Sequence, residues 1–295
     1  MRVRALAPAK LNLCLFIGAL RADGRHELVT LLESVSLADE VELRTDVATL
    51  DEVVCPGVEG PNLVSDALSR LRQRGWDAPK LRVTIDKRIP VAGGMGGGSA
   101  DAAAVLRIAP LVAPVAADAL VQIAAGLGAD VPSQLEPGLM LGTGAGDEVR
   151  SVAPRAPHAC VIVPQPRGLS TAEVYGRADE LGLPRGPMEL DRLRADVASA
   201  LESGPGLPQQ LVVNDLEPAA VSLFAGLASA LDAVRRAGAD HALMCGSGPT
   251  VAGLYWGSDG EARACEAATQ LREAYPEACV AVPVESGYGA PVPRT

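Results

Sequence analysis

Residues 90–101 read Pro-Val-Ala-Gly-Gly-Met-Gly-Gly-Gly-Ser-Ala-Asp and lead directly into the apolar run of residues 102–109. The five glycines give the backbone access to positive φ and let a ligand approach it closely. The preceding segment, residues 81–85, alternates apolar and polar side chains as a strand does. Ser99 is a candidate N-cap, and Asp101 would lie in the first turn of the helix. This order predicts a phosphate site, because unpaired amides and the helix dipole favour anions at a helix N-terminus.

Other interpretations of the glycine stretch fit less well. A flexible linker is also rich in glycine, but a linker is not framed by a strand pattern and a helix pattern. The stretch is not a P-loop, because the chain has no lysine after Lys87. It is not the dinucleotide fingerprint either, because Ser99 occupies the place of the third glycine. The sequence therefore predicts a third type of phosphate loop, with a nucleotide phosphate tail as its ligand.

The composition is that of a soluble globular chain. The 295 residues are 48% hydrophobic and 21% charged, which is enough for one large domain or two of ordinary size. The formal net charge is −10, and no basic run is available to bind a nucleic acid. Lys10 and Asn12 interrupt the apolar N-terminal stretch, and no apolar run reaches the roughly 18 residues of a membrane span. We therefore expect neither a nucleic-acid partner nor a membrane partner.

Cysteine and histidine positions favour the cytoplasm and give no metal-binding spacing. The six cysteines contain no Cys-x-x-Cys pair, which favours free thiols in a reducing compartment. The three histidines, His26, His158 and His241, are far apart in the sequence. Aromatic residues make up only 3% of the chain, which disfavours a large protein–protein interface. We expect a cytoplasmic monomer or weak homodimer.

Strand and helix patterns both occur along the whole chain. Strands are expected at residues 3–6, 13–17, 41–43, 81–85, 159–163, 242–245 and 251–255, and helices at 102–109, 120–127, 189–201, 223–237 and 261–273. Residues 153–157, Ala-Pro-Arg-Ala-Pro, are typical of a domain junction. The expected domains are residues 1–153 and 154–295.

Four motifs in order along the chain carry a resemblance to a known family. The glycine stretch, continued to residue 104, resembles the ATP-binding motif of the GHMP kinases, which include galactokinase and the homoserine and mevalonate kinases. Residues 7–13 (Ala-Pro-Ala-Lys-Leu-Asn-Leu) with 21–28 (Arg-Ala-Asp-Gly-Arg-His-Glu-Leu), residues 127–132 (Leu-Gly-Ala-Asp-Val-Pro), and residues 246–250 (Gly-Ser-Gly-Pro-Thr) after 214–217 (Asn-Asp-Leu-Glu) resemble the other family motifs. One such motif would be weak, whereas four in register are strong.

The resemblance implies an α+β fold with two domains. The N-terminal domain would be like ribosomal protein S5 domain 2, the C-terminal domain would be ferredoxin-like, and the active site would lie in the cleft between them. ATP and Mg²⁺ are the implied cofactors, with Ser99 as the implied metal ligand, although helix capping alone explains that serine equally well. The implied ATP-binding residues are Pro90, Val91, Ala92, Gly93, Gly94, Met95, Gly96, Gly97, Gly98, Ser99 and Ala100.

Two residues are implied as catalytic. Phosphorylating an alcohol requires a group that accepts the hydroxyl proton and cations that offset charge on the γ-phosphoryl group. The resemblance assigns these roles to Asp130 and Lys10. Without it, Asp130 is a typical surface turn residue and Lys10 a solvated lysine at a strand edge. Lys10 nevertheless lies within the largely apolar residues 6–17, where its ammonium must reach water or a carboxylate.

The resemblance is greatest to the GHMP kinases that phosphorylate the 2-hydroxyl of a cytidine diphosphate-linked methylerythritol in the non-mevalonate isoprenoid pathway. In their Asp-Gly-x-His segment, an aromatic residue stacks on the cytosine. Arg25 stands there in this chain, and a guanidinium plane also stacks on bases. His26 would bond the base edge and Tyr175 would form the other wall, although a structural histidine and a core tyrosine explain both residues nearly as well. The implied substrate-binding residues are Asn12, Arg25, His26, Tyr175, Gly246 and Ser247.

Two other functions stay open from the sequence. The chain would be a GHMP kinase for another small alcohol, such as homoserine or mevalonate, and Arg25 keeps this possibility open. Alternatively, it would be a nucleotide-binding regulator without catalysis, which the presence of both Lys10 and Asp130 disfavours. Turnover separates these functions, whereas ATP binding alone does not.

Overall fold

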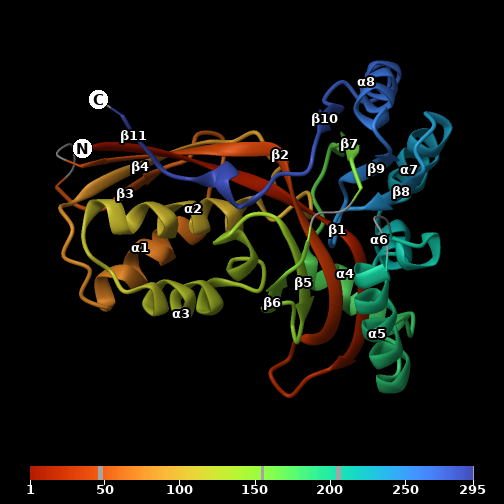
Figure 1. Ribbon diagram of the computed structural model, residues 1–295, viewed down its shortest axis with the longest axis horizontal. Coiled ribbons are helices and arrows are strands. Elements are labelled where there is room, and N and C mark those ends of the chain that lie inside the picture. Colours follow the sequence, from red (N-terminus) through yellow and green to blue (C-terminus); the bar gives the residue numbers. More distant parts are fainter. Residues whose placement is uncertain (46–48, 154–155, 204–206, 295) are drawn as a thin grey trace.

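The computed structural model describes residues 1–45, 49–153, 156–203 and 207–294, arranged as two units that each contain one sheet (Figure 1). The main path of the first sheet runs β11–β1–β2–β4–β3, with β5 paired to β2 and β6 paired to β5. Its strands are β1 (Arg2–Leu20), β2 (His26–Thr45), β3 (Glu52–Val54), β4 (Leu81–Asp86), β5 (Leu139–Thr143), β6 (Glu148–Ser151) and β11 (Val292–Arg294). The strand expected at residues 81–85 is confirmed.

The hairpin of β1 and β2 is longer than the sequence pattern predicts. The two strands contain 19 and 20 residues, whereas the pattern predicted short strands at 3–6, 13–17 and 41–43. Pro8 is accommodated beside a register shift, where the ladder is locally interrupted. Residues 7–18 are buried throughout, so the alternation that marks a strand with one solvated face is lost. The three segments predicted as strands are confirmed as parts of β1 and β2, but the full length of both strands was missed.

Three helices cover one face of the first sheet (Figure 1): α1 (Leu63–Gln73), α2 (Gly97–Val112) and α3 (Ala117–Leu127). α1 buries Val64, Ala67, Leu68 and Leu71, which form one face at helical spacing. α2 contacts β1, β2, α1 and α3 and is buried from residue 100 to 106, so its small alanines suit close packing on all sides. This packing fixes the direction in which the N-terminus of α2 points.

The second unit has a four-stranded antiparallel sheet in the order β10–β7–β9–β8. In chain order these strands are β7 (His158–Val163), β8 (His241–Met244), β9 (Val251–Trp256) and β10 (Cys279–Ala281), and they are separated by α4 (Thr171–Glu180), α5 (Pro187–Ser203), α6 (Glu217–Leu223), α7 (Gly226–Arg236) and α8 (Gly260–Leu271). The spatial order is thus fourth, first, third, second, with helices after the first and third strands. This is a ferredoxin-like arrangement with extra helices in the first crossover.

Strand β7 is buried on both faces because it joins two cores. Ala159, Val161 and Val163 belong to the core under the helices of the second unit. Cys160 and Ile162 belong to a core shared with the β1–β2 hairpin. The continuous apolar run at residues 159–163 predicted a buried strand, and the structure confirms it.

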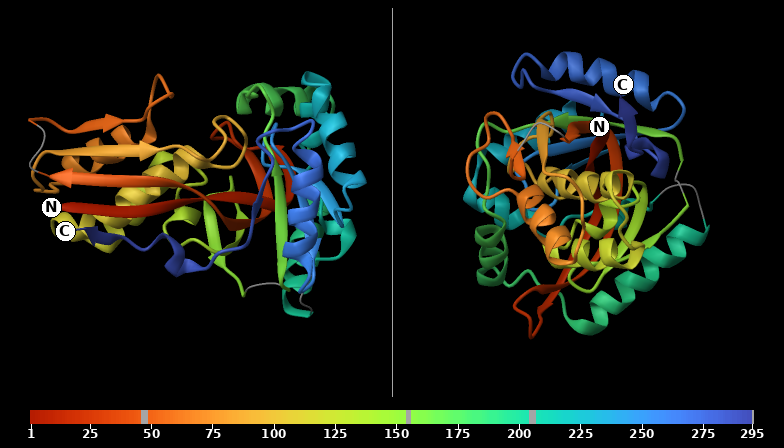
Figure 2. Two further views of the ribbon diagram at one scale, coloured as in Figure 1. Left: turned by 90° about the horizontal axis from the view of Figure 1, so that it is seen from above. Right: turned by 90° about the vertical axis from the view of Figure 1, so that its left-hand side faces the viewer.

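The chain end returns to the first sheet. β11 pairs with the first residues of β1, so the two termini lie side by side (Figure 2). Between the units, the predicted junction at residues 153–157 includes residues 154–155, which lie outside the described residues. The short helices η1 (Pro132–Gln134), η2 (Gln209–Leu211) and η3 (Ser286–Gly289) complete the fold. None of the helices in the described part of the chain is long and apolar enough to cross a membrane.

Candidate active site

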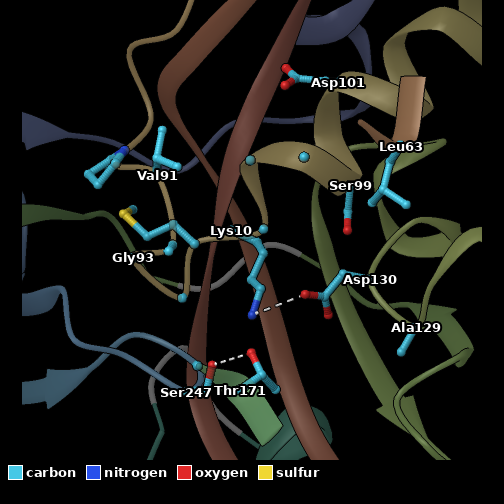
Figure 3. A pocket seen from close by; sticks show the side chains of 18 of the residues that line it. Lys10, Leu63, Val91, Gly93, Ser99, Asp101, Ala129, Asp130, Thr171 and Ser247 are labelled. Atoms are coloured by element: carbon cyan, nitrogen blue, oxygen red, sulfur yellow. Dashed lines mark hydrogen bonds and ion pairs between the residues drawn. The ribbon is translucent and has the colours of Figure 1, made fainter. Parts of the chain in front are cut away.

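The glycine stretch connects β4 to α2, and the helix begins before Ser99. α2 starts at Gly97, and its N-cap is Gly96 with a φ of 70°, a left-handed conformation that glycine adopts without strain. The prediction of Ser99 as the N-cap is therefore wrong. Ser99 is the third residue of the helix, and its hydroxyl points toward Asp130 (Figure 3). The first-turn amides of α2 have no intrahelical partner, so they suit a phosphate group.

The loop is held against the turn that follows β8. The amide of Thr250 donates to the carbonyl of Gly93 at 3.3 Å, and the amide of Lys10 donates to the carbonyl of Met95 at 3.0 Å. At Gly94, with a φ of 80°, an added Cβ would lie 2.0 Å from the carbonyl oxygen of Cys245. Two glycine motifs that are far apart in sequence therefore lie against each other at the contact between the units.

Lys10 and Asp130 form the ion pair at the centre of the site (Figure 3). The Nζ of Lys10 lies 3.4 Å from Oδ2 of Asp130, and their side chains are 6% and 33% exposed. Lys10 also donates to Oδ1 of Asn12 at 2.8 Å, and Asn12 donates to Oγ1 of Thr30 at 2.8 Å. Residues 10 and 12 share one face of β1, which places both polar side chains together. The expectation that Lys10 reaches a carboxylate is confirmed.

Two glycines leave room for the lysine side chain. A Cβ at Gly96 would lie 3.1 Å from Cγ of Lys10, and a Cβ at Gly246 would lie 3.0 Å from its Nζ. Gly246 also has a positive φ of 51°, and its Cβ would be 2.6 Å from the carbonyl oxygen of Gly94. The lysine is thus enclosed between the phosphate loop and the Gly246 turn.

Asp130 lies in the turn that follows α3. The helix ends where the sequence predicted. The helix ends at Leu127, and Val131 is fully buried with its amide bonded to the carbonyl of Gly128 at 3.1 Å. The hydroxyl of Ser133 donates to the carbonyl of Asp130 at 2.8 Å. Asp130 is a turn residue as the alternative interpretation held, but its carboxylate faces the cavity.

A cavity of about 580 Å³ surrounds the ion pair, which is within the usual size of a small-molecule site. Its lining residues come from two sets of elements, which we call the loop end and the far end. The loop end is lined by residues 90–99 with Cys55, Val58, Pro61, Asn62, Leu63, Lys87 and Asp101. The far end is lined by Leu15, Leu28, Ala129, Ala145, Gly146, Leu169 and Tyr175. Residues of both units contribute, as expected for a cleft between domains.

The predicted site residues mostly meet in this cavity. Residues 90–99, Lys10, Asn12, Asp130, Tyr175, Gly246 and Ser247 all line it, whereas Ala100 is buried in the helix core. Ser247 forms a hydrogen bond with Thr171 at 2.9 Å between their hydroxyl oxygens (Figure 3). Arg25 and His26 do not line the cavity.

His26 lies behind Tyr175. The two rings are stacked with centroids 5.3 Å apart and an interplanar angle of 29°. The Nδ1 of His26 is 2.8 Å from the carbonyl oxygen of Gly18, and its Nε2 is 3.3 Å from Asp179. Burial, followed by the charge of Asp130, raises the pKa of Tyr175. The geometry gives His26 a supporting position, which agrees with the structural alternative.

Sequence reasoning missed the segment before α1. Five cavity residues lie there: four in the loop between β3 and α1, and Leu63 at the start of α1. Asn62 caps α1 by accepting a hydrogen bond from the amide of Val64 at 2.9 Å. An asparagine before an apolar helical run was a readable signal for a helix start. The same pattern did not indicate that the loop would line a cavity, because the loop reaches α2 only in the folded protein.

Sequence reasoning also missed a buried charge cluster beneath the loop. Asp101 lies beyond the first turn of α2, so the prediction for it is wrong; its side chain is 4% exposed and pairs with Lys87 at 2.8 Å. Lys87 also contacts the fully buried Asp39. Burial, together with the charge of Asp39, raises the pKa of Asp101 to about 7 against the opposing effect of Lys87. Lys87 lies directly under Gly97, where an added Cβ would be 3.1 Å from its Nζ.

The donors around the phosphate loop fit a metal ion that arrives with a nucleotide. Within the described ranges, no group of three or more histidine, cysteine or acidic side chains could hold a metal ion. Mg²⁺ commonly uses one or two protein oxygens together with substrate phosphates. The hydroxyl of Ser99, which points toward Asp130 in Figure 3, matches that limited donor set.

Comparison with known proteins agrees with this geometry. Residues 62–138 match the model of the GHMP kinases N terminal domain, and residues 197–277 match that of the GHMP kinases C terminal domain. The chain belongs to the GHMP kinase family, whose phosphoryl donor is ATP.

Two curated relatives are named 4-diphosphocytidyl-2-C-methyl-D-erythritol kinase. The relative from Corynebacterium efficiens is 39% identical over an alignment of 273 positions, and the match covers 85% of this chain and 84% of the relative. The relative from Streptomyces coelicolor is 41% identical over an alignment of 266 positions, and the match covers 86% of this chain and 88% of the relative.

Solved structures support the fold. The crystal structure of a 4-(cytidine 5'-diphospho)-2C-methyl-D-erythritol kinase has a TM-score of 0.75 and 31% identity, and the match covers 95% of this chain and 98% of that one. A homoserine kinase from Cytophaga hutchinsonii has a TM-score of 0.72 at 18% identity, covering 99% and 96% of the two chains. The second likeness concerns the fold alone. The α+β GHMP kinase fold expected from the sequence is confirmed.

Proposed function

We propose that the chain transfers the γ-phosphoryl group of ATP to the 2-hydroxyl of 4-diphosphocytidyl-2-C-methyl-D-erythritol, a step of the non-mevalonate isoprenoid pathway. The products are the 2-phosphate and ADP. The observation that carries this proposal is the Lys10–Asp130 pair, which lies between the phosphate loop and the far end of one cavity. The substrate follows from the names of relatives that align with most of the chain.

The residues suggest how the transfer proceeds. Asp130 accepts the proton of the acceptor hydroxyl, whose oxygen then bonds to the γ-phosphorus while the bond to the ADP oxygen breaks. The ammonium of Lys10 keeps the carboxylate oriented and offsets the negative charge of the phosphoryl group in transfer. The amides of the loop and of the first turn of α2 hold the other phosphates. Burial strengthens each of these interactions.

Ser99 is the proposed protein ligand for Mg²⁺. A Mg²⁺ ion arriving with the nucleotide would supply positive charge that stabilises the transferred group. The support for Ser99 is the direction of its hydroxyl, which points into the cavity beside the phosphate loop (Figure 3).

The two cavity ends receive the two substrates. The loop end holds ATP, with the phosphates at residues 90–99 and the adenosine toward Asn62 and Leu63. The far end holds the cytidyl group of the acceptor, because its walls are apolar and include the ring of Tyr175. Asn12, Gly246 and Ser247 lie between them, where they contact the acceptor near its reacting hydroxyl.

The proposed setting is the cytoplasm, and the proposed state is a monomer or a weak homodimer. All six cysteines are free, which suits a reducing compartment. The low aromatic content, 3%, gives little material for a strong interface. A sedimentation measurement at several protein concentrations tests the second point.

Replacing Asp130 with Asn tests the role of the base. We expect kcat for ADP release with the cytidyl acceptor to fall by about 10²–10⁴, because the amide cannot accept the proton. ATP affinity measured by calorimetry should stay within about twofold, since Asp130 is not part of the loop. Asp232→Asn is the matched control, because Asp232 is 58% exposed on α7 and does not line the cavity.

The acceptors distinguish the alternatives. Homoserine and mevalonate are offered beside the cytidyl substrate under the same conditions. Turnover with one of them alone would move the chain to another substrate within its family. ATP binding without turnover of any acceptor would indicate a nucleotide-binding regulator and contradict the proposal.

A further inference from the structure

Arg25 makes two ion pairs at the tip of the β1–β2 hairpin. Its guanidinium lies 3.0 Å from Oδ2 of Asp23, within the tip itself. It also lies 3.0 Å from Oδ2 of Asp147, which belongs to the turn between β5 and β6. Arg25 therefore connects two segments that are more than a hundred residues apart in sequence, and neither contact involves the cavity directly.

The turn that Arg25 contacts forms a wall of the far end. Ala145 and Gly146 of this turn line the cavity. The second carboxylate oxygen of Asp147 accepts the amide of Ala145 at 3.2 Å, so Asp147 shapes the turn and joins it to the hairpin. Gly146 has a φ of 91°, and an added Cβ would lie 3.3 Å from Leu28 and 3.9 Å from Ala129. The wall is thus packed against two other residues of the far end.

The residue after Arg25 supports another wall of the same end. His26 stacks on Tyr175, and its two ring nitrogens are engaged by Gly18 and Asp179. Neighbouring residues of one hairpin therefore hold two walls, Arg25 through Asp147 and His26 through Tyr175. The amide of Leu28 also donates to the carbonyl of Gly144 at 2.7 Å, so the same strand contacts both ends of the turn.

We propose that Arg25 is a positioning residue that fixes the Ala145–Gly146 wall through Asp147 and so restricts the far end to a pyrimidine. The inference rests on the proposed function for the identity of the acceptor. A wall held in place excludes the larger double ring of a purine, whereas a mobile wall admits it. This role replaces direct stacking of Arg25 on the base, because the guanidinium is already engaged by two carboxylates outside the cavity.

The Arg25–Asp147 ion pair affects the position of the Ala145–Gly146 wall more than the stability of the whole protein. The side chains of Arg25 and Asp147 are 47% and 23% exposed, and ion pairs at such exposure stabilise a fold little. Loss of the pair should therefore leave the unfolding transition unchanged while the turn becomes more mobile. The expected signature lies in acceptor binding and selectivity.

Arg25→Ala and Asp147→Asn test the proposal by steady-state kinetics. Asparagine keeps an oxygen for the Ala145 amide and removes the charge that Arg25 needs. We expect each variant to raise KM for the cytidyl acceptor about tenfold, with kcat and KM for ATP within about twofold. The double variant should raise KM for the cytidyl acceptor no more than either single variant does, because each substitution removes the same Arg25–Asp147 contact. Arg235→Ala removes a comparably exposed arginine on α7, 52% exposed, and should change none of these values.

Selectivity is measured with an adenosine diphosphate-linked methylerythritol offered beside the cytidyl acceptor. The ratio of kcat/KM for the two acceptors should fall about tenfold in Arg25→Ala and in Asp147→Asn. Arg25→Lys should recover part of the ratio, because lysine keeps the charge opposite Asp147. Recovery by Arg25→Phe, or an unchanged Asp147→Asn variant, would instead indicate direct stacking on the base and overturn the proposal.

Amide hydrogen exchange provides a readout that needs no acceptor. Peptides covering residues 139–151 should exchange faster in Arg25→Ala and in Asp147→Asn than in the wild type or in Arg235→Ala. Unchanged exchange would overturn the positioning role, whichever acceptor the enzyme uses. Faster exchange in a protein that does not phosphorylate the cytidyl acceptor would support the positioning role and contradict the proposed function alone.

Discussion

At the scale of single residues, the position of the Lys10 side chain depends on two glycines, Gly96 and Gly246, that leave room for it. The resemblance to the GHMP kinases predicted Lys10 and Asp130, and the order of strand, glycines and helix predicted the phosphate loop. They did not indicate that Gly96 and Gly246 enclose the lysine side chain, since that depends on the meeting of two units. For the same reason they gave no sign that Arg25 would turn toward Asp147.

Gly246→Ala tests this enclosure. The new methyl group would lie 2.6 Å from the carbonyl oxygen of Gly94 and 3.0 Å from Nζ of Lys10, so it displaces the lysine or the loop. We expect kcat/KM to fall by about 10²-fold, as for a small misplacement of reacting groups. Gly182→Ala is the control for backbone strain, because its φ is +66° and a Cβ there meets nothing within 4 Å. Equal losses in both variants would contradict the steric explanation.

Among the elements, α2 shows what the sequence pattern settles and what it leaves open. The apolar run predicted the helix, but the start was misplaced because Gly96 takes the capping position in a left-handed conformation. The strands of the hairpin were predicted too short because burial on both faces removes the alternation. The sequence pattern also did not predict that Arg107 of α2 would be largely buried. Its guanidinium donates to the carbonyls of Leu6, Gln134 and Gly289.

Arg107→Met should destabilise the protein markedly. Burial lowers the pKa of Arg107 to about 10, yet its charge is satisfied by three carbonyls from β1, η1 and η3. Methionine fills a similar volume but leaves these acceptors unpaired. We expect the free energy of unfolding to fall by about 3 kcal/mol in urea titrations. Arg192→Met, on a side chain that is 82% exposed, should change it by less than about 0.5 kcal/mol.

At the scale of the whole molecule, the two units share a buried ion pair. Nε2 of His158 in β7 lies 2.8 Å from Oε2 of Glu33 in β2, and the side chains are 2% and 4% exposed. Nδ1 of His158 faces the carbonyl oxygen of Ala156 at 2.9 Å. Both ring nitrogens therefore have acceptors, which suits the charged imidazolium. The sequence placed His158 beside a buried strand but gave no indication of its partner in the other unit.

This pair should make stability depend on pH. Burial lowers the pKa of His158, but the hydrogen bond and charge of Glu33, with the Ala156 carbonyl, outweigh it and raise the pKa above its ordinary 6.5. The stabilisation is therefore complete below about pH 6.5 and is lost as pH rises through the higher folded-state value. In urea titrations, the loss in free energy of unfolding caused by His158→Gln should be larger near about pH 5.5 than near about pH 8.5.

His241→Gln provides a control of opposite sign. Burial lowers the pKa of His241, against the effect of Asp240, so its contribution to stability should improve as pH rises. A pH profile for His158→Gln that is flat, or that runs in the same direction as that of His241→Gln, would contradict the assignment of the His158–Glu33 pair.

The return of β11 to the first sheet has a consequence for how the chain is synthesised. β1 is translated before its partner at residues 292–294, which follows every strand of the second unit. Until then, Arg2, Val3 and Arg4 form an open edge on a nascent chain, which another strand could join. The arginines at positions 2 and 4 pair with Glu42 and Glu40 of β2, and their charges protect that edge against aggregation during translation.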